Sequence, residues 1–580
     1  MNIALENIIS QKLTAVFNTL GLDPKFAFVK VSDRPDLSDF QCNGALALAK
    51  SAHKNPREIA TQIATELEKD ADFSKISVDG PGFINLCLSN DFIANTLQQI
   101  AMDENFGIAK TTDPHTVVLD FGGPNVAKAM HVGHLRSGVI GEAVQRILRF
   151  VGQTVVSDVH LGDWGTPMGM ILAEIIKQDG DLTKTTDYNI DEITEFYKRA
   201  NIRCKEDESA KEDARIITAK LQDGDPVYRK AWAHLRKVSV DAVKKNYEDL
   251  DVHFDLWLGE SDAHETCKEI VALAKEKKLS VLDEGATIIR LDDDEKQKLP
   301  PVILEKSDGG FTYHTTDIAT IKMRVDALKA KEIDYFVDSR QSLHFEQVFK
   351  AVDKLGIAPQ VKLAHYGFGT VNGADGKPFK TRDGGVMTLE NLISLSKDKV
   401  RESMPKAGEV EGYGEAEIEK LISQVALAAI KFQDLKNNTA SGYVFDLDDF
   451  AKFDGKTGPY IQYAIARINS ILRKAQDKKL APAQILITTA DEKNLALKIA
   501  QLNSVIARAA EEKEPSIIAD YAYTLAQVFS SFYTAAPIMT AETKELIQSR
   551  LALSELTRDI LKLLLYLLGI EAPEIMLKKA

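Results

Sequence analysis

A strand, a loop and a helix follow one another between residues 116 and 150, and this succession constrains the fold more than any other part of the sequence. Residues 116–120 are an apolar run of the kind found in buried strands, and residues 135–150 repeat apolar side chains at helical spacing. Between them lies a loop that contains glycine, proline and asparagine. The helix N-terminus offers unpaired N–H groups and the positive end of a dipole. We therefore expect a nucleotide phosphate to bind at this junction.

Two histidines and a glycine stand at the mouth of the predicted helix. His131 and His134 can donate hydrogen bonds to phosphate oxygens that gain charge during a reaction. Gly133 lies between them and has no side chain that would keep a flat base away from the backbone. A His-x-Gly-His motif is weak by itself, so an ordinary junction with two surface histidines is the alternative interpretation.

The residues around this motif are more specific than the motif itself. Asn125 and Lys128 precede it, and Leu-Arg-Ser follows at residues 135–137. Together these residues resemble the first signature of class I aminoacyl-tRNA synthetases, and the asparagine and the lysine are similar to those of the arginyl-tRNA synthetase family. The resemblance implies a multidomain α/β protein. It would have a Rossmann-like parallel-sheet catalytic domain, an N-terminal α+β domain and a C-terminal all-α anticodon-binding domain.

The size and the composition of the chain fit several soluble domains. Its 580 residues allow more than one domain of about 150 residues, and 44% hydrophobic with 27% charged residues is typical of globular proteins. The net charge of −14 argues against a chain that coats nucleic acid, although local basic patches can still bind RNA. The most apolar stretch, residues 561–570, contains Lys562 and is too short to cross a bilayer. We expect no membrane segment and no secretory signal.

The four cysteines are far apart in the sequence and form no Cys-x-x-Cys pair; they are Cys42, Cys87, Cys204 and Cys267. A structural zinc site or a disulfide framework is therefore not expected, and a reducing cytoplasm fits best.

Residues 1–108 are predicted to form a separate α+β domain. Residues 3–20 have helical periodicity and end at a glycine, and residues 76–88 alternate like two strands around a Gly-Pro-Gly turn. Polar residues within 39–43 and 80–85 resemble the N-terminal extension of arginyl-tRNA synthetases, which touches the tRNA elbow in that family. The alternative is that these polar residues only shape the fold.

Residues 109–455 are predicted to form the catalytic domain. Residues 160–165 resemble a family segment that is usually followed by a glutamine where this chain has Pro167, so a contact assigned to that glutamine is not carried over. Trp164 is expected to be a packing anchor rather than a ligand. A charged, glycine-poor stretch at about residues 184–260 predicts a helical insertion, which is either a lid over the tRNA acceptor end or a set of solvated helices.

Two further segments carry candidate substrate residues. Tyr313 precedes a helix that we expect to begin near Thr315 or Thr316, and Asp317 would lie in the first turn of that helix. The side chains of Tyr313 and Asp317 could then line one side of a cleft. Gln341 follows a strand that reads as buried, and open α/β sheets bind ligands at the carboxyl ends of their strands.

A glycine-rich loop at residues 363–382 contains three basic side chains, Lys377, Lys380 and Arg382. Such a loop can close over a triphosphate and stabilise the pyrophosphate that leaves. The loop resembles the second class I signature, Lys-x-x-Lys, with Phe379 in place of the usual serine. The family resemblance then implies that Lys128 supplies part of the phosphate contact that the usual form of this loop would make. A basic surface turn is the alternative interpretation.

Residues 456–580 are predicted to be helical. Tyr460, Tyr463 and Arg467 share one helix face, and tyrosines beside an arginine can stack on unpaired bases and pair with phosphate. The alternative role of each tyrosine is half-buried packing within the domain, and the sequence does not decide between the two roles. The run 458–467 closely resembles the start of the anticodon-binding domain of arginyl-tRNA synthetases.

The resemblance implies that the chain activates arginine with ATP and transfers it to tRNA(Arg). The implied catalytic residues are Lys128, His131, His134 and Lys380. The residues implied at ATP are His131, Gly133, His134, Gly367, Phe368, Lys377 and Lys380. The residues implied at arginine are Asp120, Asn125, Tyr313, Asp317 and Gln341. The residues implied at tRNA are Tyr460, Tyr463 and Arg467.

A guanidinium presents a planar array of donors that two carboxylates can match, so Asp120 and Asp317 are the acids expected beside it. Helix caps or salt bridges are their alternative roles. Mg²⁺ would accompany ATP, held by phosphate oxygens and water rather than by a metal site of the protein. The expected partners are tRNA(Arg), L-arginine and ATP, and the chain is expected to be a monomer. The rival interpretations are a small nucleotidyltransferase and a synthetase-like RNA-binding paralogue.

Overall fold

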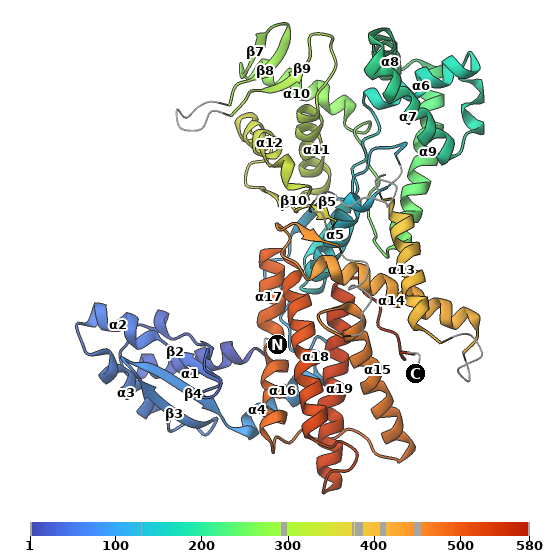
Figure 1. Ribbon diagram of the computed structural model, residues 1–580. Helices are drawn as coiled ribbons and strands as arrows, with labels where there is room; N and C mark the ends of the chain where they lie inside the picture. Colours follow the sequence, from blue (N-terminus) through green and yellow to red (C-terminus); the bar gives the residue numbers. More distant parts are fainter. Residues whose placement is uncertain are drawn as a thin grey trace. The chain divides into compact units, whose positions relative to one another are not determined.

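The computed structural model describes residues 3–128, 130–291, 299–373, 376, 387–405, 413–445 and 454–577. The chain forms two compact units (Figure 1). One unit contains Met1–Thr111, Ser403–Phe432 and Ala451–Ala580, and the other contains Thr112–Glu402 and Gln433–Phe450. Each unit contains a four-stranded sheet.

The sheet of the second unit is parallel and confirms the predicted α/β class. Its strands are β5 (Thr116–Phe121), β6 (Thr154–Asp158), β10 (Glu332–Phe336) and β11 (Lys362–His365), in the order β11-β10-β5-β6. The predicted apolar run at residues 116–120 is thus a central strand, which explains why it lacks the alternation of a half-buried one.

Two helices connect neighbouring strands of this sheet. Helix α5 (Val132–Phe150) links β5 to β6, and α12 (Ser342–Leu355) links β10 to β11. The chain therefore leaves β5 in one direction across the sheet and β10 in the other. Ligands of such sheets bind where the strand order reverses, at the carboxyl ends of the two central strands. The helix mouths at His131 and Gln341 both lie at this point.

Helix α11 (Tyr313–Leu328) covers the sheet with α10 (His264–Glu276), and both contribute to the core around Val118 and Ile333. The expected start of α11 at Thr315 or Thr316 is wrong, because Tyr313 is its first residue. The hydroxyl of Thr315 donates to the carbonyl of Leu304 instead of capping the helix. That carbonyl belongs to an antiparallel sheet of β7 (Ser280–Asp283), β8 (Ala286–Ile289) and β9 (Val302–Glu305).

The charged stretch after β6 is a cluster of helices. It consists of α6 (Thr166–Asp179), η2 (Thr183–Asp187), α7 (Ile190–Glu206), α8 (Glu208–Gln222) and α9 (Pro226–Asp249). Helix α6 packs against α7 and α8, so the cluster begins before residue 184.

The end of α9 is anchored in the catalytic fold by Tyr247, which is fully buried and whose hydroxyl donates to the carbonyl of Gly122. Gly122 has a φ of +75°, and a Cβ there would lie 2.5 Å from the tyrosine oxygen. Only glycine therefore allows this contact.

A buried arginine joins α5 to the last turn of α14 (Glu415–Leu435) and to the segment that follows this helix. Arg136 forms an ion pair with Asp434, 3.2 Å from Nε to Oδ2, and both side chains are buried. Its Nη1 donates to the carbonyls of Gly369 and Ser441 at 2.8 Å each. These bonds hold together the ends of β12 (Val371–Asn372) and β13 (Tyr443–Val444), which pair in parallel. Helix α13 (Leu389–Ser403) completes this region.

The first unit begins with an α+β region. Its elements are α1 (Leu5–Thr19), η1 (Pro24–Phe26), β1 (Lys30–Val31), β2 (Phe40–Cys42), α2 (Gly44–Ala52), α3 (Pro56–Leu67), β3 (Phe73–Asp79), β4 (Phe83–Leu88) and α4 (Asn90–Met102). The strands form an antiparallel sheet in the order β1-β2-β4-β3.

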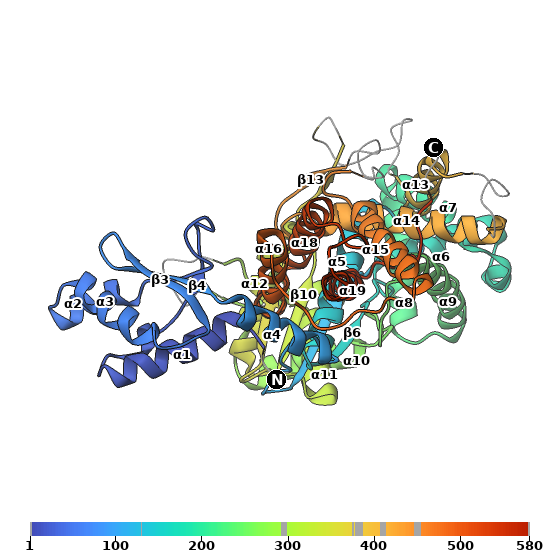
Figure 2. The same cartoon turned by 90° about the horizontal axis from the view of Figure 1, so that it is seen from below.

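The rest of this unit is helical. Its helices are α15 (Gly458–Asp477), α16 (Ala490–Ala500), α17 (Leu502–Glu512), α18 (Ser516–Ala535) and α19 (Lys544–Leu567). Figure 2 shows α19 end-on. Asp39 pairs with Lys493 at 2.8 Å, and Asn503 donates to the carbonyl of Gly107 at 2.7 Å. Within the described residues, no helix is long and apolar enough to cross a membrane.

The Arg136→Met variant should be markedly less stable than the parent chain. It leaves the buried Asp434 carboxylate without its cation, which costs about 3–5 kcal/mol. Differential scanning fluorimetry should show a melting temperature several degrees lower. The control Lys237→Met removes an exposed pair with Asp241, which is worth about 0–1 kcal/mol. Equal shifts in both variants would contradict this account of Arg136.

Candidate active site

His131 and His134 cap the first turn of α5 reciprocally. The Nδ1 of His131 accepts the N–H of Gly133 at 3.0 Å, and the Nδ1 of His134 accepts the N–H of His131 at 3.1 Å. The ring centroids are 4.1 Å apart. The backbone beside them pairs with the segment before α13, since Val132 donates to the carbonyl of Met387 at 3.1 Å. Two N–H groups of a helix start are thereby satisfied by the motif itself.

Both imidazoles are held in the neutral form. Burial lowers the pKa of His134 to about 3, with His131 and Lys128 adding repulsion. Burial and then Lys128 lower the pKa of His131. A neutral imidazole whose Nδ1 accepts a hydrogen bond carries its proton on Nε2. Each ring is thus fixed as a donor through Nε2, which suits phosphate oxygens.

Gly133 has a role that the sequence did not reveal. A Cβ at this position would lie 2.7 Å from Cε1 and 2.8 Å from Nδ1 of His131. The glycine therefore makes room for the imidazole of His131 to fold back onto the helix start. The predicted approach of a base to Gly133 stays a prediction.

Lys128 lies in the loop before the histidines, and its Nζ is 4.8 Å from the ring centroid of Tyr197 in α7. The charge of Lys128 lowers the pKa of both imidazoles, so it adds to the positive side of the site. The other predicted phosphate-binding cations, Lys377 and Lys380, lie outside the described residues with Arg382.

Asn125 is held against the segment that follows β6. It forms a bridge with Gly162, whose N–H donates to the carbonyl of Pro124 at 3.2 Å. Trp164 is buried and donates from Nε1 to His264 at 3.1 Å. Its ring packs on Trp232 with centroids 5.0 Å apart, as expected of a packing anchor.

Gly367 and Phe368 follow β11, and their segment pairs with the residues that follow β10. The N–H of Phe368 donates to the carbonyl of Val337 at 3.2 Å, and its carbonyl accepts the N–H of Ser339 at 3.0 Å. The ring of Phe368 is buried 5.9 Å from the guanidinium carbon of Arg136. The predicted contact of Gly367 and Phe368 with ATP stays a prediction.

The first turn of α11 brings Tyr313 and Asp317 to one side. The carboxylate of Asp317 is hydrogen-bonded to Nε2 of His344 in α12, and the side chain of Tyr313 is 64% exposed. Gln341 immediately precedes α12; its side chain makes no capping hydrogen bond to the helix, and the residue is exposed. Residues from α11 and α12 thus converge at the carboxyl end of β10.

Asp120 differs from Asp317 because it is already paired with a cation of the chain. Its Oδ2 lies 2.6 Å from Nη2 of Arg324, which also contacts Asp158 at 2.8 Å. All three side chains are buried. The structure therefore contains the salt bridge that was the alternative for Asp120, and its contact with a substrate stays a prediction.

Glu260 is a candidate that the sequence reading missed. Burial, then Asp163 and Asp317, raise its pKa to about 8. Burial, Glu260 and Tyr197 raise the pKa of Tyr313. Glu260, Asp317 and Tyr313 are therefore neighbours in a region of carboxylates. A single glutamate in an irregular segment after the insertion gives no periodic or motif signal, so only the fold reveals it.

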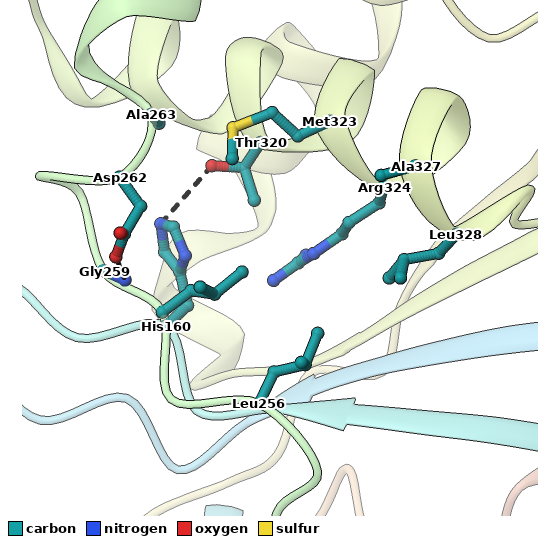
Figure 3. A pocket seen from close by; sticks show the side chains of 11 residues that line it. His160, Leu256, Gly259, Asp262, Ala263, Thr320, Met323, Arg324, Ala327 and Leu328 are labelled. Atoms are coloured by element: carbon teal, nitrogen blue, oxygen red, sulfur yellow. Dashed lines mark hydrogen bonds between the residues drawn. The ribbon is translucent and has the colours of Figure 1, made fainter.

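An apolar cavity of about 200 Å³ lies behind the side of α11 that carries Arg324. Figure 3 shows the side chain of Arg324 extending into it and the imidazole of His160 pointing toward the hydroxyl of Thr320. The remaining lining residues are Leu256, Leu258, Gly259, Asp262, Ala263, Met323, Ala327 and Leu328. Within the described part of the chain, the residues predicted for substrates do not line this cavity.

The three predicted tRNA residues lie on α15 in the first unit. The guanidinium carbon of Arg467 is 4.9 Å from the ring centroid of Tyr463 and 5.5 Å from that of Tyr533. Tyr463 and Tyr533 are 38% and 39% exposed. Tyr460 instead packs on Tyr523, with centroids 5.4 Å apart. Arg467 between two tyrosines is an open stacking surface, and Tyr533 is the member that the sequence did not indicate.

Metal ligands do not gather at this site. In the ranges that the structure covers, no group of three His, Cys, Asp or Glu side chains could hold a metal ion.

Three family models match consecutive parts of the chain. Residues 4–88 match the arginyl tRNA synthetase N terminal domain, residues 96–447 match the catalytic domain of tRNA synthetases class I (R), and residues 461–576 match the DALR anticodon binding domain. The fold and the His131–His134 site therefore define a class I aminoacyl-tRNA synthetase.

Relatives identify the family within this class. An arginine–tRNA ligase of Francisella tularensis is 44% identical over 98% of this chain and 99% of its own length, and one of Agathobacter rectalis is 43% identical. The crystal structure of arginyl-tRNA synthetase from Plasmodium falciparum matches with a TM-score of 0.80 and 28% identity, over 99% of this chain and 100% of that one. The Thermus thermophilus arginyl-tRNA synthetase shows the same fold, with a TM-score of 0.78 and 24% identity. The chain belongs to the arginyl-tRNA synthetase family.

The Gly133→Ala variant should lose adenylate formation without losing its fold. The added methyl group displaces the imidazole of His131, and a displacement of about 1 Å can cost roughly 100-fold in rate. Single-turnover formation of the adenylate should slow by one to two orders of magnitude, with circular dichroism and the melting temperature unchanged. A variant with the parent rate would show that the His131 ring position does not matter.

Proposed function

We propose that this chain is an arginine–tRNA ligase. It activates L-arginine with ATP to arginyl-adenylate and pyrophosphate, then transfers arginine to the terminal adenosine of tRNA(Arg) for protein synthesis. The observation that carries the proposal is the pair of imidazoles at the mouth of α5, whose Nδ1 atoms accept backbone N–H groups and leave Nε2 free to donate. The full-length match to arginine–tRNA ligases supports the choice of amino acid.

In the first step, a carboxylate oxygen of arginine attacks the α-phosphorus of ATP in line, and the bond to pyrophosphate breaks. The Nε2–H groups of His131 and His134 donate to the phosphate oxygens as their charge increases. Lys128 and Lys380 neutralise the charge that leaves with pyrophosphate. Gly133, Gly367, Phe368 and Lys377 are the other residues proposed at ATP. Magnesium, when bound to the phosphates, supplies further neutralisation.

In the second step, a ribose hydroxyl of the terminal adenosine attacks the arginyl carbonyl carbon, and AMP leaves. Neither step needs a covalent intermediate with the enzyme. The work of the chain is to align the reacting groups and to stabilise charge.

Arginine specificity is proposed to rest on Asp317 and Glu260 at the guanidinium, completed by Tyr313 and Gln341. Glu260 is partly buried beside two other acids and so favours a cationic ligand. A lysine side chain would leave acceptors of this pocket unpaired, which is how a polar site rejects an analogue. Asn125 is proposed at the amino-acid end of the substrate. Asp120, which the sequence places beside the guanidinium, stays a candidate there, although Arg324 already pairs with it.

The tRNA is proposed to contact the anticodon-binding helices through Tyr463, Arg467 and Tyr533, with Tyr460 beside them. We also propose the domain division 1–108, 109–455 and 456–580, with a helical insertion at about residues 184–260. We also propose, from the family resemblance, that the protein is a monomer and acts in the cytoplasm.

ATP–pyrophosphate exchange with each amino acid, with and without tRNA, tests the function directly. Exchange that depends on arginine and tRNA is the expected result, and Asp317→Ala should abolish it in a folded protein. A tRNA-free signal with another amino acid would overturn the proposal. So would the absence of exchange with arginine, which the RNA-binding alternative predicts.

The affinity for arginine should rise with pH up to about 8, because Glu260 must lose its proton to face the guanidinium. Its pKa of about 8 in the free protein means that the carboxyl is mostly protonated at neutral pH. Binding of the cation then releases a proton, so the affinity rises by up to about tenfold per pH unit below the pKa. Arginine titrations of the protein–tRNA complex at several pH values measure this slope. In Glu260→Gln the affinity should be lower and the slope flat; an unchanged slope would exclude Glu260 as its source.

Removal of Arg467 or of the Tyr463 ring should weaken tRNA(Arg) binding by about tenfold or more, since a stacked base contributes roughly 1–3 kcal/mol. The variants Arg467→Ala and Tyr463→Ala test this by filter binding. Tyr463→Phe keeps the ring and should bind normally. Equal losses in the alanine and phenylalanine variants would contradict a stacking role.

A further inference from the structure

The helical insertion places one aromatic side chain at the activation site. Tyr197 lies on α7, and its ring centroid is 4.8 Å from Nζ of Lys128. The face of an aromatic ring carries partial negative charge, so it attracts an ammonium at this distance. Lys128 and Tyr197 are far apart in the sequence, and the contact exists only because the insertion folds against the catalytic loop.

The helix that carries Tyr197 is firmly built. Its first turn is closed by a capping box in which Asn189 accepts from Glu192 N–H and the Glu192 carboxylate accepts from Asn189 N–H. Ile193 and Phe196 are buried on the face that packs against α6 and α8. Tyr197 is half-buried at the edge of this face. Its ring is therefore positioned by a rigid helix rather than by a loop.

The same ring also reaches the side of the site where Tyr313 lies. Tyr197 is one of the groups that raise the pKa of Tyr313, after burial and Glu260. Lys128, for its part, is close enough to both imidazoles to lower their pKa. Tyr197 thus contacts the lysine proposed for the phosphates and is near enough to the tyrosine proposed for arginine to affect its pKa.

We propose that Tyr197 is a positioning residue for Lys128, which makes α7 of the insertion part of the active site. A lysine side chain has a flexible stem of four methylene groups and samples many rotamers when its ammonium has no partner. The ring of Tyr197 holds the ammonium on the side of His131 and His134, ready for the phosphates of ATP. The inference rests on the proposed role of Lys128 in activation.

A double-mutant cycle between Tyr197 and Lys128 tests the proposal. Single-turnover adenylate formation, measured with saturating arginine, ATP and tRNA, should slow about three- to thirtyfold in Tyr197→Leu. Tyr197→Phe keeps the ring face and should stay within about twofold of the parent. Lys128→Ala should slow the step further, and Tyr197→Leu should then add no loss, because its effect passes through the lysine.

A matched control comes from the same insertion. The Nζ of Lys220 lies 5.6 Å from the ring centroid of Tyr228, a half-buried tyrosine in α9. Tyr228→Leu removes a similar cation–ring contact and should leave the rate of adenylate formation unchanged. The melting temperature and the tRNA affinity should be the same in all of these variants.

The outcomes separate this inference from the proposed function. A normal rate in Tyr197→Leu, or equal losses with leucine and phenylalanine, overturns the role of Tyr197 while the role of Lys128 stands. An undiminished loss in the Lys128→Ala background also overturns it, since the ring would then act by another route. A normal rate in Lys128→Ala overturns both the proposed role of the lysine and the inference built on it.

Discussion

The chemistry proposed for this molecule depends on two imidazoles that each accept a hydrogen bond from the backbone. The backbone N–H groups at the start of α5 take up Nδ1 of His131 and of His134, and burial keeps both rings neutral at ordinary pH. The remaining protons must then sit on Nε2. Charge is supplied separately by Lys128. Because the two imidazoles are neutral, they do not repel the nearby ammonium of Lys128. Their Nε2–H groups still offer fixed donors when negative charge develops on a phosphate.

Local pattern accounts for the framework of the catalytic unit. The apolar run before the loop and the helical spacing after it predict β5 and α5, because a buried strand and an amphipathic helix each leave a periodic trace. The start of α11 was misplaced because Thr315 bonds to β9, and a propensity rule cannot know where that strand lies. The sequence did not indicate Glu260, Tyr197 or Tyr533 as site residues for a related reason. Each acquires its meaning from residues far away in the sequence.

The chain holds a guanidinium of its own beside the proposed arginine pocket. Arg324 is buried with Asp120 and Asp158, both of which contact Nη2. Asp317 and Glu260, by contrast, form no ion pair with an arginine or a lysine among the described residues. This difference distinguishes two acids that are paired within the fold from the two acids proposed for the substrate. It also explains why sequence alone could not rank Asp120 and Asp317, since both are single acids at the start or end of an element.

The contact of Tyr247 with Gly122 has a consequence for how such a chain could be redesigned. The last turn of α9 fills space next to Gly122 and Gly138, where even a methyl group would collide with the tyrosine ring or hydroxyl. The insertion is therefore packed against the start of the loop that follows β5 and against α5. It cannot be excised or exchanged like a removable module unless both glycine sites are rebuilt to fill the hole.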